Sequence, residues 1–175
     1  QPQNKTELQT AVDLWASDNK SSALWSYGDI NTWDVSLITN MSSLFKDKAT
    51  FNDNISTWDV GKVTSMYMMF QGASVFNQDI SSWKVDNVTN MVRVFVHSRE
   101  FNQDISSWNV SKVTDMNHMF YGAKKFNQDI GSWNVDNVTN MLWMFVHADI
   151  FNQDISGWDV SNVTRMDRMF YNAFA

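Results

Sequence analysis

The sequence predicts an α/β repeat solenoid, because a single 25-residue unit recurs along most of the chain. Five copies open on phenylalanine at constant spacing: Phe51, Phe76, Phe101, Phe126 and Phe151. Residues 26–50 follow the same pattern from Ile30 onward, which makes six units. Such a period is typical of arrays in which each unit buries its apolar face only against its neighbours. We therefore expect one continuous repeat domain over residues 26–175, with a separate segment over residues 1–25 before it.

Alignment of the six units separates constant positions from variable ones. The fifth position is always Ile, the eighth Trp, the tenth Val, the sixteenth Met and the twentieth Phe, while the thirteenth is Val or Ile. Large apolar side chains that recur at fixed positions are expected to stack from unit to unit. These columns therefore predict a continuous core that runs along the array.

The pattern within each unit predicts one short strand and one short helix. In the second half, positions 16, 19, 20 and 23 are apolar, and this spacing is one face of a helix. Gly72 and Gly122 at position 22 are then interpreted as helix C-caps, which His97 and His147 at the same position do not fit. The first half, such as Phe-Asn-Gln-Asp-Ile-Ser-Ser-Trp, alternates loosely and predicts a strand of a parallel sheet. A mostly-β solenoid is the alternative.

Residues 1–25 do not fit the repeat and predict an N-terminal helical cap. Asn4 or Thr6 can cap a helix that carries an apolar stripe and ends near residues 17–19. The open end of a repeat array needs a cover, and this helix would supply it. Trp15 and Trp25 are expected in the core at the junction between cap and repeats.

Composition narrows the class of function. The chain has no cysteine, which excludes a disulfide framework and any thiolate metal site. Its net charge of −6 and the lack of a Lys/Arg cluster argue against nucleic acid and against an anionic membrane surface. No apolar run reaches the roughly 20 residues that a membrane span needs. No arrangement of nucleophile and base recurs, so we expect no enzyme activity.

The outward positions of the second half differ strongly from unit to unit. A face without a binding role is expected to drift among small polar residues, whereas here large aromatic, apolar, histidine and arginine side chains occur. The candidate partner-binding residues are Tyr67, Met68, Arg93, Val96, His97, His118, Tyr121, Leu142, Trp143, Val146, His147 and Arg168. We expect a protein or glycan ligand on this face, and self-association through the same stripe is the alternative.

An acidic column at position 4 is the candidate site for a calcium ion. Asp79, Asp104, Asp129 and Asp154 would lie about 4.8 Å apart if the units stack as strands do. Calcium could neutralise their repulsion through oxygen ligands. Bonds from the carboxylates to backbone amides at the corners of the units would serve as well, and we favour that structural role. No cofactor is expected, with calcium as the alternative.

The repeat Phe-Asn-Gln-Asp-Ile-Ser-Ser-Trp-Asn-Val-Ser-Lys-Val-Thr-Asp-Met-Asn-His-Met-Phe-Tyr-Gly-Ala at residues 101–123 closely resembles that of BspA-like surface proteins. The same 25-residue repeat is named for mycoplasmal lipoprotein-associated proteins. The resemblance covers roughly residues 11–175. It implies a leucine-rich-repeat-like solenoid, a secreted or cell-surface location and a role in adhesion, with no shared catalytic chemistry. Residues 91–98 and 141–148 depart from it, because Val-His replaces the glycine-containing turn.

Overall fold

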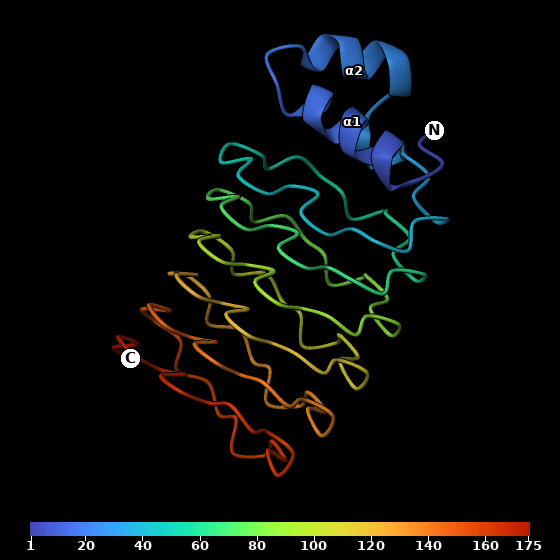
Figure 1. Cartoon of the computed structure of the whole chain (residues 1–175). Coiled ribbons are helices and arrows are strands. Elements are labelled where there is room, and N and C mark those ends of the chain that lie inside the picture. Colours follow the sequence, from blue (N-terminus) through green and yellow to red (C-terminus); the bar gives the residue numbers. More distant parts are fainter.

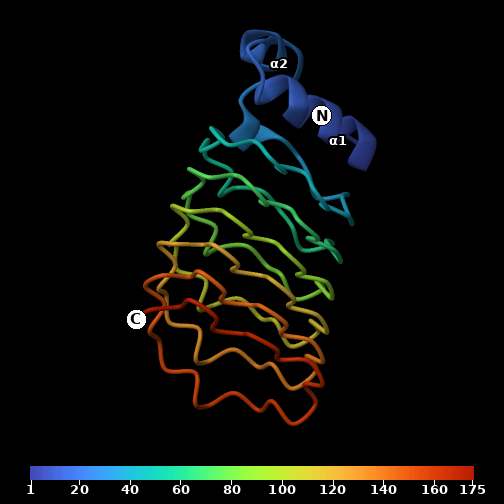
Figure 2. The same ribbon diagram turned by 60° about the vertical axis from the view of Figure 1, so that its left-hand side comes forward.

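The computed structural model shows two short helices seated on a stack of six coils, and each 25-residue unit makes one coil (Figures 1 and 2). Helix α1 spans Lys5–Trp15, α2 spans Lys20–Tyr27, and the short 3₁₀ helix η1 spans Ile30–Thr32. The coils follow in chain order from the helices to the C-terminus, which lies at the opposite end of the stack. No helix is long and apolar enough to cross a membrane.

The predicted α/β solenoid with a strand and a helix in every coil is wrong. The chain forms no sheet, and its α-helices are confined to residues 5–27, so that α2 ends two residues inside the first unit. Parallel pairing is limited to one residue per coil, at position 15 of each unit, through Asn40, Ser65, Asn90, Asp115, Asn140 and Arg165. The mostly-β alternative is wrong for the same reason, and so is a leucine-rich-repeat-like coil with a strand.

The second half of each coil is a run of overlapping turns instead of the predicted helix. In coil 4, Met119 and Tyr121 donate their backbone N–H to carbonyls three residues earlier, at 3.1 Å each. The N–H groups of the residues that alternate with these, His118 and Phe120, donate to carbonyls of coil 5 at 2.9 Å each. Successive backbone N–H groups thus bond in turn to a carbonyl of the same coil and to a carbonyl of the next coil. Every donor is satisfied without the hydrogen bond to the carbonyl four residues earlier that defines an α-helix.

Left-handed backbone at two positions produces this alternation and prevents a helix. Position 18 has positive φ in every coil, as at His118 (56°) and Trp143 (58°). Position 22 does as well, at Asp47, Gly72, His97, Gly122, His147 and Asn172. A right-handed helix cannot contain such residues in its interior. Gly72 and Gly122 are therefore turn residues of the coil, and their interpretation as helix C-caps is wrong.

The N-terminal segment packs on coil 1, as its apolar stripe predicts, but it contains two helices. Asn4 caps α1, because its side-chain oxygen accepts the N–H of Glu7 at 3.0 Å. Gln9 donates from Nε2 to the carbonyl of Leu44 in coil 1 at 3.0 Å. Trp15 is buried as expected and donates from Nε1 to Asp53 at 3.0 Å. Trp25 on α2 is 90% exposed, so the prediction that it belongs to the core is wrong.

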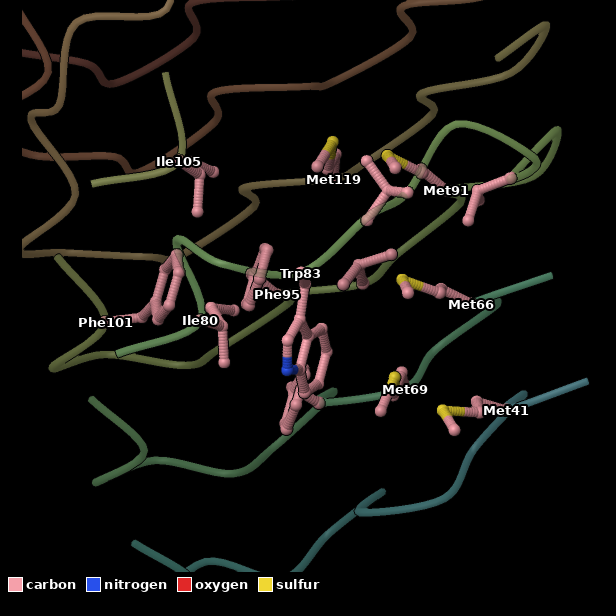
Figure 3. Close-up of a cluster of buried hydrophobic side chains, with 14 of the residues drawn as sticks. Met41, Met66, Met69, Ile80, Trp83, Met91, Phe95, Phe101, Ile105 and Met119 are labelled. Carbon is pink, nitrogen blue, oxygen red and sulfur yellow. The ribbon is translucent and has the colours of Figure 1, made fainter. Parts of the chain in front are cut away.

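The core is the set of constant columns, as the alignment predicts. Figure 3 shows methionines of successive coils, such as Met41, Met66 and Met91, pointing inward one above another. The position-20 phenylalanines stack along the array, with Phe95 and Phe120 5.7 Å apart between ring centres. The repeat tryptophans of coils 2 to 6 each bond to the coil before, as Trp108 Nε1 does to the carbonyl of Ile80 at 3.1 Å. Neighbouring coils therefore share both their core and their hydrogen bonds.

An asparagine ladder joins the coils at position 2. The side-chain oxygen of Asn102 accepts the backbone N–H of Asn127 at 2.9 Å and the side-chain amide of Gln128 at 3.0 Å. Equivalent bonds to the next backbone N–H are made by Asn52, Asn77 and Asn127. Because these amides lie at the start of each unit, they fix the register in which one coil meets the next.

Candidate binding surface

Six side chains of coils 4, 5 and 6 form a continuous patch on the outer side of the turns, which we call the aromatic face: His118, Tyr121, Trp143, His147, Arg168 and Tyr171. Trp143 lies at its centre, with its ring 5.3 Å from that of His118 and 6.1 Å from that of Tyr121. The guanidinium of Arg168 lies 5.7 Å from the ring of Trp143 and 5.8 Å from that of Tyr171. The face thus combines planar rings with one cation.

A pocket of about 180 Å³ opens in the aromatic face. It is lined by Tyr121, Trp143, Val146, His147, Arg168 and Tyr171. Ligand sites that enclose a whole small molecule usually measure about 300 to 1,000 Å³, so this pocket fits one anchoring group of a larger partner. Its lining offers aromatic surface, two phenol hydroxyls and a guanidinium, and it contains no carboxylate.

The backbone at position 18 aims these side chains outward. His118, Trp143 and Arg168 each occupy this position with positive φ, and each is followed by a fully or almost fully buried methionine. The left-handed conformation costs a non-glycine residue roughly 1 to 2 kcal/mol. Glycine or asparagine would form the same turn at lower cost, so the fold itself does not require a tryptophan or an arginine here.

Odd and even coils alternate at position 22, and this alternation shapes the face. His97 leans over Gly122 in the next coil, where an added Cβ would lie 2.4 Å from Nδ1 of the imidazole. Asp47 leans over Gly72 in the same way, at 2.5 Å from its Oδ1. Glycine therefore makes room for the side chain of the preceding coil. The ring of Tyr121 then packs edge-to-face against His97 at 5.2 Å and His147 at 6.0 Å.

The structure brings together only part of the predicted binding residues. His118, Tyr121, Trp143, His147 and Arg168 belong to the aromatic face, and His97 adjoins it through Tyr121. Val96 and Val146 are buried, at 7% and 2% exposure, and of the two only Val146 lines the pocket. The remaining candidates, Tyr67, Met68, Arg93 and Leu142, do not line the pocket. Tyr171, which the candidate set omits, completes the pocket and occupies the same unit position as Tyr121.

Partial burial lowers the pKa of His118 on the aromatic face and of His97 beside it. Desolvation is the main cause for His97 and His118, because it disfavours the charged ring. The positive charge of Arg99 lowers the pKa of His97 further, and that of Arg93 lowers the pKa of His118. Asp115 opposes the shift at His118. The neutral forms are therefore favoured, and these rings act as aromatic surface near neutral pH.

The acidic column at position 4 makes local bonds to the backbone. In coil 4, Asp104 accepts the N–H of Ser106 on Oδ1 at 2.9 Å, and Asp79, Asp129 and Asp154 accept the N–H two residues later at 2.9 Å in the same way. Bonds to the Ser106 side chain and backbone lower the pKa of Asp104. No group of three or more His, Asp or Glu side chains is arranged to hold a metal ion. The carboxylates thus serve as turn-forming groups.

The sequence matches one known family over nearly its whole length. Residues 14–128 and 93–175 both match the family described as Mycoplasma protein of unknown function, DUF285. The two matches overlap and together reach from the end of α1 to the last coil. No curated protein and no solved structure matches the chain. Because the family pattern covers well over half of the sequence, the chain belongs to the DUF285 family.

Proposed function

We propose that the chain is a non-enzymatic recognition module that binds a protein or glycan partner through the aromatic face. The observation that carries this proposal is the pocket of about 180 Å³ between Tyr121, Trp143, Arg168 and Tyr171. It lies where the units differ most in sequence, outside the columns that build the core.

The residue types of the pocket favour recognition of a macromolecule. Trp, Tyr and Arg are the side chains that most often contribute large shares of binding energy at interfaces. The ring of Trp143 and the adjoining guanidinium of Arg168 can stack on the flat face of a sugar or on an aromatic or peptide group. The two tyrosine hydroxyls supply directional hydrogen bonds at the rim.

The backbone conformation is a second, independent support. Trp143 occupies a left-handed position with φ of 58°, which costs roughly 1 to 2 kcal/mol relative to a residue that adopts this conformation freely. Position 18 is left-handed in all six coils, so the turn itself belongs to the fold, and glycine or asparagine would form it at lower cost than tryptophan. The large ring at this position is therefore not required by the turn, which supports a role in recognition.

A secreted or cell-surface location and a role in adhesion complete the proposal. The resemblance of the repeat to BspA-like surface proteins supports this setting, since those proteins present repeat arrays outside the cell. The chain carries a net charge of −6, so a strongly acidic partner would be repelled except at the cationic pocket. We therefore expect neutral sugars or aromatic-rich peptide segments as the first ligands to test.

The proposal is tested with defined panels of immobilised oligosaccharides and synthetic peptides. We expect the intact chain to bind members of one panel, and Trp143→Ser to weaken that binding about tenfold or more, as loss of an interface anchor does. Trp25→Ser is the matched control, because it removes an exposed tryptophan from α2, away from the pocket. The proposal fails if no member of either panel binds. It also fails if Trp143→Ser binds as tightly as the unaltered chain and the Trp25→Ser control.

A further inference from the structure

We infer that the ligand of the aromatic face is a glycan that carries a carboxylated sugar, held by its carboxylate in the pocket between coils 4, 5 and 6. This inference rests on the proposed function and names the chemical class of the ligand for the same site. Its basis is a gathering of positive charge on one face of a chain whose net charge is −6. Local charge of this sign attracts an anionic group, and a glycan that is neutral elsewhere keeps repulsion from the rest of the chain small.

Arginine side chains border the aromatic face on both sides. All four arginines of the chain lie in coils 3 to 6. The guanidinium of Arg168 in coil 6 lines the pocket and lies 5.7 Å from the ring of Trp143. In coil 3, the charge of Arg93 lowers the pKa of His118, which places this second guanidinium within electrostatic reach of the face. The rings of coils 4 and 5 therefore lie between two cations.

The acidic side chain near His118 is already engaged by other groups. Asp115 accepts the backbone N–H of Asn117 on Oδ1 at 2.9 Å and the side-chain amide of Asn140 on Oδ2 at 3.2 Å. The three ion pairs of the chain are all made by lysines, namely Lys20, Lys48 and Lys124. The guanidinium groups beside the aromatic face therefore keep their N–H donors for a ligand.

The pocket supplies several donors that suit a carboxylate. A planar guanidinium, such as that of Arg168, offers paired N–H groups that match the two oxygens of a carboxylate. The hydroxyls of Tyr121 and Tyr171 line the same pocket and add further donors. The ring of Trp143 provides apolar surface against which the C–H groups of a sugar ring can pack. A carboxylated sugar combines the charge and the flat apolar side that this lining requires.

The backbone of this face favours a sugar over an extended peptide. A peptide that binds in extended form needs free main-chain donors and acceptors on its receptor. The N–H groups of His118 and Trp143 are instead bonded to carbonyls of the next coil, at 2.9 and 3.2 Å. Side chains are therefore the groups that this face offers, and sugars are bound through side-chain donors and aromatic rings.

The test measures binding of two matched pairs of sugars to the intact chain by titration calorimetry. One pair is sialyllactose and lactose. The other is a disaccharide of glucuronate and N-acetylglucosamine, with and without reduction of its carboxylate to an alcohol. We expect at least one acidic sugar to bind about tenfold or more tightly than its neutral counterpart, because a charge-assisted hydrogen bond is gained. Added salt should reduce this preference.

Two variants locate the preference at the pocket. Arg168→Gln should remove most of it, because the guanidinium that pairs with the carboxylate is lost. Lys62→Gln is the matched control, since it removes the same charge from an exposed side chain of coil 2 that does not line the pocket. This control should keep the full preference for the acidic sugar.

Three results would overturn the inference. The first is equal binding of each acidic sugar and its neutral counterpart, and the second is an equal loss of preference in Lys62→Gln and Arg168→Gln. The third is tighter binding, through Arg168, of a peptide with one carboxylate beside an aromatic residue, which would make the ligand a peptide. If uncharged ligands still bind and Trp143→Ser abolishes that binding, the proposed function stands and this inference alone fails.

Discussion

Trp143 and Phe145 lie two residues apart in coil 5, and their backbones make the same kind of hydrogen bond. Each donates its N–H to coil 6, at 3.2 Å to Asp167 and 2.8 Å to Met169. Their side chains differ completely. Phe145 is fully buried between Phe120 and Phe170 at 5.6 and 5.4 Å, while Trp143 lies half-buried on the aromatic face.

The turns form whichever side chain occupies position 18. The backbone bonds are present whether this position holds Ser43, Met68, Arg93, His118 or Trp143. At position 20 the side chain is part of the core, and only phenylalanine occurs there. Packing in the core thus determines the residue at position 20, whereas the residue at position 18 is free to vary and is available for recognition.

Paired substitutions at these two positions give the largest expected difference. Phe145→Ala should lower the free energy of unfolding by about 3 to 5 kcal/mol, because it leaves a cavity in a closely packed column. Trp143→Ser should lower it by about 1 kcal/mol or less, since only partial ring stacking is lost. Chemical denaturation of both variants measures the two values. Equal losses of unfolding free energy would show that Trp143 stabilises the fold as Phe145 does, and would contradict the difference between positions 18 and 20.

Gly122→Ala at position 22 should have an intermediate effect on stability. The added Cβ meets the His97 ring at 2.4 Å, and φ at this residue is +67°, so a loss of about 1 to 2 kcal/mol in unfolding free energy is expected. In a His97→Ala background the same change should cost less, because the steric part is removed and only the backbone part remains. A double-mutant cycle by chemical denaturation gives the difference. A cost that is unchanged by His97→Ala would contradict the proposed fit between the two coils.

The smallest expected effect is a dependence of stability on pH. Burial lowers the pKa of His97 and His118 below the usual 6.5. As pH falls from about 7.5 to about 5, the unfolded chain therefore binds protons before the folded chain, and the free energy of unfolding decreases. The aspartates with lowered pKa act in a lower range, because their stabilising contribution is lost only as pH falls through values below 3.8.

Denaturation at a series of pH values, compared with a His97→Asn and His118→Asn double variant, measures this effect. Asparagine tolerates the left-handed backbone at both positions, so the variant removes the titrating groups without changing the turn. The slope between about pH 7.5 and about pH 5 should flatten. A variant that keeps the full slope would place the responsible groups elsewhere in the chain.

The sequence predicted the core and the order of the units, but not the local backbone. The apolar positions 16, 19, 20 and 23 do share one side, as in Met116, Met119, Phe120 and Ala123, which are all fully buried. Overlapping turns satisfy that spacing as well as a helix does, so periodicity alone could not separate them. The distinguishing signal was position 22, where Asp, Gly, His and Asn are the residues that best tolerate left-handed backbone.

The candidate surface could be predicted as a region but not residue by residue. A helix would place Val96 and Val146 outward, whereas the turns leave both buried, and only Val146 lines the pocket. Tyr171 belongs to the pocket through contacts with the coil before it, such as its edge-to-face packing with His147 at 6.4 Å. Contacts of this kind depend on how far each coil is rotated on the last one, which a repeat pattern does not encode.

The fit of His97 over Gly122 also limits how repeat units can be gained or lost in evolution. The repeat seen in sequence is 25 residues, but the separation between equivalent histidines, His97 and His147, is fifty. Loss of coil 4 alone would set one imidazole directly against another where a glycine now lies. If two adjacent coils were lost or gained together, every contact between successive position-22 residues would be of a kind that already occurs in the stack. Duplication in pairs is therefore the step that this stack tolerates best.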